Sequence, residues 1–161
     1  MSDNPYAPPK ARVGEPVVRG LSEAPPEARL YTQAQVAVAA FLGSPLAAGW
    51  LISRNHRTLA RPDQANQALV VGIGATLALF VLRIVLSDRI PLIALSVAGA
   101  VACRAWADAQ FSTVLQRHRA AGGANYSWWR VVGLSLLCTA IIVVVVFIVL
   151  TLLFSFGILV H

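Results

Sequence analysis

The sequence predicts an all-α integral membrane protein with about four transmembrane helices and a disordered, proline-rich N-terminal tail. Of its 161 residues, 57% are hydrophobic and only 12% are charged, whereas an ordinary soluble domain is roughly 25% charged. The mean hydropathy is correspondingly high, at +0.68. The apolar residues also gather into long runs separated by short polar stretches, which is the pattern typical of membrane-spanning helices.

The N-terminal segment has a different composition from the rest of the chain. It holds six of the nine prolines, and its four basic residues balance four acidic ones. We predict that residues 1–29 are disordered and precede a helical membrane domain over 30–161, because so little apolar surface cannot offset chain entropy. No signal peptide is expected, since a basic start followed at once by an apolar stretch is missing. The motif PYAPPK fits a ligand of polyproline grooves, but a plain flexible tail is the preferred interpretation.

The first two apolar segments are predicted to span the membrane. The first covers about 33–53, and its roughly 21 residues match a hydrocarbon thickness of about 30 Å at about 1.5 Å per residue. The second covers about 68–86 and carries a single charge, Arg83. This arginine lies close enough to the end of the segment for its side chain to reach the headgroups.

The third segment leaves two interpretations open, because its uncharged stretch over 90–103 is shorter than the 17 or so residues that a span needs. In the favoured one, a span over about 90–107 continues as a helix past Arg104 and ends at or beyond the membrane surface. Trp106 supports this interpretation as an interfacial residue, and no helix breaker follows Pro91 before Arg119. In the other, segments two and three form a hairpin that crosses only partly.

The fourth segment is the most apolar part of the chain. Residues 131–160 carry no formal charge, and we predict a span over about 131–155. Trp128, Trp129 and Arg130 precede it, and an aromatic pair with a cation is typical of headgroup anchors. Its β-branched residues weaken a helix in water, but a lipid environment requires the backbone to satisfy its own hydrogen bonds.

A glycine and a proline interrupt the first predicted span, in the motif Gly43–Ser44–Pro45. Proline removes a backbone hydrogen bond and bends a helix, so Ser44 or a neighbouring helix is expected to supply the missing partner. Small residues recur every fourth position here and in the next two segments. Such faces let helices pack closely. We therefore interpret five residues as a kink within a packing face, with a substrate gate as the less favoured alternative: Gly43, Ser44, Pro45, Gly72 and Gly74.

Arginine positions predict a topology. With four spans, the loop after the first span and the segment over 104–130 share one side and hold seven arginines, against four near the membrane on the other. Because arginine-rich loops stay in the cytoplasm, both termini are predicted to lie outside it. A three-span chain would break this scheme.

The sequence contains few groups that could perform chemistry. The three histidines lack carboxylate or cysteine neighbours at metal-ligand spacing, so we interpret them as solvated, and we interpret Cys103 and Cys138 as buried small residues. No P-loop, GxSxG or HExxH motif occurs. We therefore expect no cofactor, no metal and no enzymatic activity. After residue 30 the only carboxylate side chains are Asp63, Asp88 and Asp108, which disfavours proton-coupled transport.

The arginines of the membrane domain indicate contact with the lipid bilayer. Arg83 and Arg104 are candidate intramembrane charges, although snorkelling explains both equally well. The net charge of +6 resides in the membrane-associated part, so anionic lipid headgroups are the expected partner and nucleic acid is not. A homo-oligomer or a larger membrane complex is a further expectation from the small-residue faces.

Two sequence blocks carry a resemblance. FLGSPLAAGWLISRNHRTL and GGANYSWWRVVGLSLL resemble blocks in a family of small bacterial inner-membrane proteins, over about 31–137. The resemblance implies a multi-pass protein of the bacterial inner membrane. It carries over no activity and no catalytic residue.

Two functions follow as hypotheses. The first is a non-enzymatic accessory or scaffold protein that packs through its small-residue faces against itself or a larger complex. The alternative is a small channel or transporter in which the Pro45 region lines a pathway. The first predicts a stable partner, and the second predicts flux after reconstitution.

Overall fold

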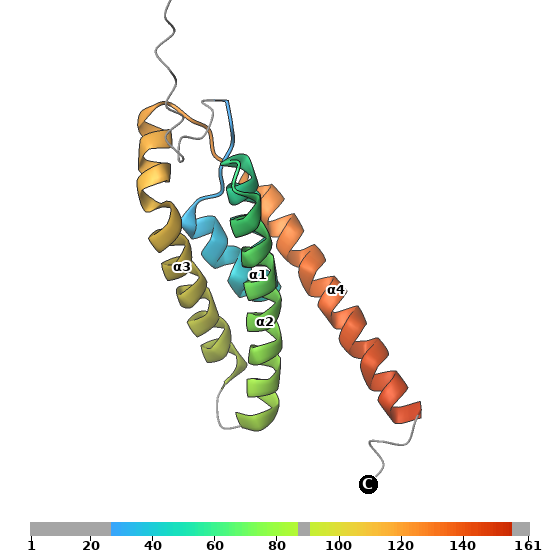
Figure 1. The fold of residues 1–161 in the computed structure, drawn as a ribbon. Helices are drawn as coiled ribbons and strands as arrows, with labels where there is room; N and C mark the ends of the chain where they lie inside the picture. The colour runs from blue at the N-terminus through green and yellow to red at the C-terminus, as the bar shows by residue number, and fades with distance from the viewer. Residues whose placement is uncertain (1–26, 87–90, 156–161) are drawn as a thin grey trace, which may run out of the picture.

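The computed structural model describes residues 27–86 and 91–155 and contains four helices. These are α1 (Gln33–Thr58), α2 (Pro62–Leu86), α3 (Leu92–Ala120) and α4 (Trp128–Ser155) (Figure 1). The all-α class is therefore confirmed. The PYAPPK motif, Asp88, His161 and most of the predicted tail lie outside the described residues.

Helix α1 folds back on itself. Ser44 interrupts it with φ 78° and ψ 167°, and the two ends of α1 meet: the Tyr31 N–H donates to Asn55 Oδ1 at 2.9 Å, and Asn55 Nδ2 donates to the Tyr31 carbonyl at 2.9 Å. These residues are 24 apart in sequence and would be about 36 Å apart on a straight helix. Thus α1 consists of two half-helices, 33–43 and 45–58, joined by a sharp turn.

This path differs from the predicted crossing over 33–53. Length and apolar composition do suit a membrane span, as expected. However, 11 residues of helix reach only about 16 Å, roughly half the hydrocarbon thickness. In a membrane α1 is therefore a re-entrant hairpin, which enters and leaves on one side.

Helices α2 and α4, like α1, are long and apolar enough to cross a membrane. Helix α3 does not meet this criterion. Helix α2 begins at Pro62, earlier than the predicted 68, because proline suits the first turn of a helix, where an N–H has no partner. Helix α3 continues without interruption past Arg104, as the favoured interpretation predicted. It approaches α2 at Gly99, where an added Cβ would lie 3.4 Å from Leu79 Cδ1.

The re-entrant hairpin forms the centre of the fold. Each of α2, α3 and α4 packs mainly on α1 rather than on the other two, and the buried core includes Ala39, Ala47, Leu51 and Ile52 of α1. The outer faces of α2 and α4 expose large apolar side chains, which suits contact with lipid. Helix α4 diverges from the other helices toward its C-terminal end (Figure 1), and no residue over 141–155 is buried. The protein is therefore a multi-span helical membrane protein.

The chain entering α1 lies beside the α3–α4 connection. The Leu30 N–H donates to the Ala124 carbonyl at 3.4 Å, and the Tyr126 N–H donates to the Leu30 carbonyl at 3.2 Å. The prediction that the start of the first segment lies opposite this connection is therefore wrong, because the re-entrant hairpin removes one crossing. The start of α2, the end of α3 and the start of α4 lie at one end of the molecule (Figure 1). We term it the arginine end, because these helix ends and the segments beside them carry Arg29, Arg54, Arg57, Arg61, Arg117, Arg119 and Arg130.

Candidate functional site

The hairpin turn is built by the motif Gly43–Ser44–Pro45. Ser44 takes up the left-handed φ that reverses the chain, and Pro45 begins the second half-helix, where its missing N–H costs nothing. The motif is thus a chain reversal rather than the predicted kink. Gly43 is required by close packing, because a Cβ there would lie 2.7 Å from the Ser135 carbonyl oxygen of α4.

Hydroxyl groups from two neighbouring helices complete the turn. Thr76 Oγ1 of α2 accepts from the Leu46 N–H at 2.9 Å, and Thr139 Oγ1 of α4 donates to the Leu42 carbonyl at 2.6 Å. Ser44 Oγ lies 3.3 Å from the same Leu46 nitrogen. These contacts satisfy backbone groups at the ends of both half-helices, which lipid could not do. Neighbouring helices therefore supply hydrogen-bond partners at the turn, for the Leu46 N–H and the Leu42 carbonyl.

Two glycines hold the second half-helix against α2. A Cβ on Gly49 would lie 2.8 Å from the Ala68 carbonyl oxygen, and a Cβ on Gly72 would lie 3.0 Å from the Pro45 carbonyl oxygen. Gly72 is thus in the predicted packing face. Gly74 is not, since a Cβ there would meet nothing within 4 Å.

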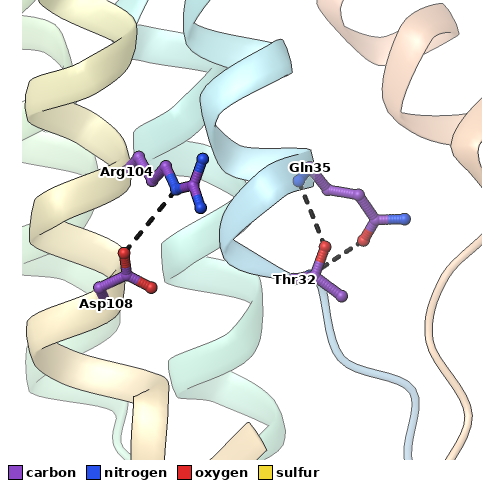
Figure 2. Close-up of polar contacts among 4 residues, drawn as sticks. All are labelled: Thr32, Gln35, Arg104 and Asp108. Carbon is purple, nitrogen blue, oxygen red and sulfur yellow. Dashed lines mark hydrogen bonds and ion pairs between the residues drawn. The ribbon is translucent and has the colours of Figure 1, made fainter.

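The open end of the hairpin is closed by a polar and aromatic cluster. Thr32 and Gln35 form a reciprocal capping box at the start of α1 (Figure 2), and Gln35 Nε2 donates to the Tyr126 carbonyl at 2.6 Å. Tyr31 stacks on Tyr126 with ring centroids 4.2 Å apart. Burial raises the pKa of the Tyr31 phenol, and the positive charge of Arg130 opposes this increase.

The predicted interface anchors lie at the start of α4. The side chains of Trp128 and Trp129 are exposed, as headgroup contact requires. The guanidinium of Arg130 lies 4.8 Å from the Tyr126 ring centroid in a cation–π contact. Arg130 therefore also connects α4 to the open end of the hairpin, opposite the Ser44 turn.

The two candidate intramembrane charges have different surroundings. Arg104 lies 3.9 Å from Asp108 one turn along α3 (Figure 2), and both side chains are about half exposed, so this pair contributes little stability. Arg83 lines a cavity beside the hairpin turn. Arg104 also lines a cavity, between α1 and α3, but only the Arg83 cavity includes the hairpin turn.

Two cavities lie along α2 and α3. The first, termed the Arg83 cavity, has a volume of about 440 Å³ and is lined by residues that include Ser44, Pro45, Thr76, Arg83 and Gly99. The second, termed the His56 cavity, has a volume of about 310 Å³ and lies toward the arginine end. Its lining includes His56, Arg61, Gln64, Gln67, Trp106 and Gln110.

Sequence reasoning missed His56, which it assigned to a solvated loop. His56 is only 2% exposed, and its Nε2 lies 2.6 Å from Gln110 Oε1 of α3. The spacing of His56 could have predicted its burial, since Ala48, Ile52 and His56 follow one another every four residues and share a helix face. His118, also interpreted as solvated, is likewise buried.

The remaining chemistry is sparse. Cys103 is buried and Cys138 half-buried, and both are free thiols. Over 27–86 and 91–155, no group of three or more His, Cys, Asp or Glu side chains is placed to hold a metal ion.

Comparisons of the chain with protein-family models, with curated proteins and with solved structures find no match.

Proposed function

We propose that the protein provides a pathway for small anions across a bacterial inner membrane, with the arginine end in the cytoplasm. The observation that carries this proposal is the hairpin turn, whose non-helical backbone at Ser44 interrupts a segment apolar enough to span a membrane and lines a cavity. Such backbone is tolerated in membranes where protein buries it or where it lines a cavity. Broken helices are also the usual site of solute binding in transporters.

The spacing of the two cavities supports a pathway along α2 and α3. On α2, Val71 lines the His56 cavity and Thr76 lines the Arg83 cavity, so about 8 Å of helix separates them. On α3, the corresponding residues are Trp106 and Gly99, about 10 Å apart. The barrier between the cavities is therefore about a third of the hydrocarbon thickness.

The charges along this route favour anions. Each cavity is lined by one arginine, Arg61 or Arg83, and among the described residues that line the two cavities none is an Asp or Glu. The second half-helix also directs its N-terminus, the positive end of its dipole, toward the turn. Positive groups along a pore attract anions and repel cations.

The test is flux through the purified protein in liposomes. We expect uptake of chloride or phosphate above protein-free liposomes, with little uptake of potassium. Arg83→Gln should reduce anion uptake about tenfold, because it removes the charge from one cavity. Arg104→Gln is the matched control, since it removes the same charge from an exposed ion pair outside both cavities. Anion uptake no faster than in protein-free liposomes contradicts the proposal.

A second candidate, a non-enzymatic accessory or scaffold protein, rests on a separate observation. The C-terminal half of α4 exposes Phe147 and Phe154 and has no buried residue over 141–155, so it is available to a second copy or to another membrane protein. Native mass spectrometry of the protein extracted in mild detergent tests this. A reproducible heterologous partner supports the accessory role, and a bare monomer contradicts it.

A further inference from the structure

A groove runs between the first half of α1 and α3, and we term it the α1–α3 groove. It has a volume of about 250 Å³, and its described lining is apolar except for Arg104. Phe41, Val97 and Val101 line the groove and are exposed, so the described protein leaves much of their apolar surface uncovered. In a membrane, a hydrocarbon chain is the natural occupant of such a groove.

The ion pair of Arg104 and Asp108 lies at one end of this groove (Figure 2). The distance of 3.9 Å between Arg104 Nε and Asp108 Oδ2 is longer than a hydrogen bond. The two side chains are 62% and 48% exposed. The guanidinium is therefore open to an anion from outside the chain, and the carboxylate is open to a cation with N–H groups.

The order of these groups along α3 matches the order of groups in an amino phospholipid. Val97, Val101, Arg104 and Asp108 are spaced by four, three and four residues and share one face of the helix. Because α3 ends at the arginine end (Figure 1), a carboxylate, a guanidinium and an apolar groove follow one another from that membrane surface inward. A phospholipid with an amino headgroup presents an ammonium, a phosphate and a hydrocarbon chain in the same sequence. The charges and the apolar surface are therefore complementary to one such lipid.

We propose that this face of α3 binds a zwitterionic phospholipid with a primary ammonium, whose phosphate accepts from Arg104, whose ammonium donates to Asp108 and whose acyl chain lies in the α1–α3 groove. The inference goes beyond the proposed anion pathway and is independent of it. Among the described lining residues, the groove shares only Phe41 with the Arg83 cavity and none with the His56 cavity.

Phosphatidylethanolamine and phosphatidylcholine with identical acyl chains are the matched probes. Both carry the phosphate, but the quaternary ammonium of phosphatidylcholine has no N–H to donate. We would add the two lipids at equal concentration to the full-length protein in mild detergent and compare the bound copies by native mass spectrometry. Phosphatidylethanolamine should bind about fivefold more tightly, as expected for one charge-assisted hydrogen bond at a partly exposed site. Equal binding of the two lipids overturns the proposal.

Asp108→Ala tests the headgroup contact. It removes the acceptor for the ammonium, so the two lipids should then bind equally. Asp63→Ala is the matched control, because it removes an exposed carboxylate from the first turn of α2 and should keep the preference for phosphatidylethanolamine. Loss of the preference in both variants, or in neither, contradicts the site.

Val101→Trp tests the groove, because the larger side chain occupies the space of the acyl chain. Both lipids should bind at least about fourfold more weakly, the effect of displacing one methylene group from apolar surface. Ile93→Trp is the control on an exposed position of the same helix, outside the described lining of the groove, and should leave binding unchanged. Equal effects of the two substitutions contradict the placement of the chain.

Phosphatidylglycerol separates recognition by the ion pair from attraction to the arginine end. It carries the anionic phosphate without an ammonium, and general attraction to several arginines would favour it over a zwitterionic lipid. We expect it to bind more weakly than phosphatidylethanolamine, because it leaves Asp108 without a cation. Tighter binding of phosphatidylglycerol overturns the proposal.

Discussion

Gly43→Ala tests whether the hairpin turn packs on α4 as described. The added Cβ would lie 2.7 Å from the Ser135 carbonyl oxygen, 2.8 Å from Ser135 Cα and 2.8 Å from the Ala47 Cβ. Ordinary contact begins at 3.4 Å, so the turn and α4 must separate by about 0.7 Å, and two of the three neighbours are backbone atoms that cannot rotate away. Overpacking of this kind costs about 1–3 kcal/mol.

Gly74→Ala is the matched control on α2, where a new Cβ meets nothing within 4 Å. Replacing a glycine inside a helix by alanine there should stabilise the protein by about 0.5–1 kcal/mol. The two substitutions are chemically identical and should therefore shift stability in opposite directions. The free energy of unfolding of both variants in mixed micelles measures this, and equal effects of the same sign would refute the packing.

Three further predictions concern individual contacts and are checked by the same unfolding measurement. Asn55→Leu leaves the Tyr31 N–H and carbonyl without partners and should cost about 2–4 kcal/mol, whereas Asn66→Leu, on an exposed position of α2, should cost less than about 1 kcal/mol; similar costs contradict the closed hairpin. Thr76→Val keeps the side-chain volume but removes the acceptor for the Leu46 N–H, and should cost about 1–2 kcal/mol; a neutral effect contradicts that bond. Asp108→Asn should change stability by less than about 1 kcal/mol, because its ion pair is exposed; a larger loss would show that the pair is buried in the membrane.

The helical membrane class was predictable because hydropathy alone determines it. The start of α4 at the Trp128–Arg130 anchors also follows from local composition. These features depend on residues close together in sequence, where transfer free energies add up segment by segment.

The fold-back of α1 was not predictable from hydropathy, since two half-helices and one full span have the same composition. The chain reversal itself depends on neighbouring residues, because it occurs at Ser44 and Pro45. The groups that satisfy the backbone of the turn, Thr76 and Thr139, lie 30 and 97 residues along the chain from the residues that they bond. The small residues around Gly43 did predict close packing, but not the helix that packs there.

The His56 cavity was missed for a related reason. His56 stands next to arginines in sequence, so local composition indicated a solvated loop. Its burial arises from Gln110 and Phe111 of α3, which only the tertiary structure places against it. A polar residue in a chain of this kind must therefore be judged by its helix face as well as by its immediate neighbours.

The re-entrant path of α1 is the central claim, and a distance between spin labels at its two ends tests it most directly. Labels at Ala34→Cys and Arg57→Cys, both on exposed positions, are attached in a background in which Cys103 and Cys138 are replaced by alanine. The distance is measured by pulsed electron paramagnetic resonance in nanodiscs. A folded-back α1 predicts a separation well below the about 35 Å that 23 residues of straight helix would give. A distance near 35 Å would show that α1 crosses the membrane, and would contradict the hairpin.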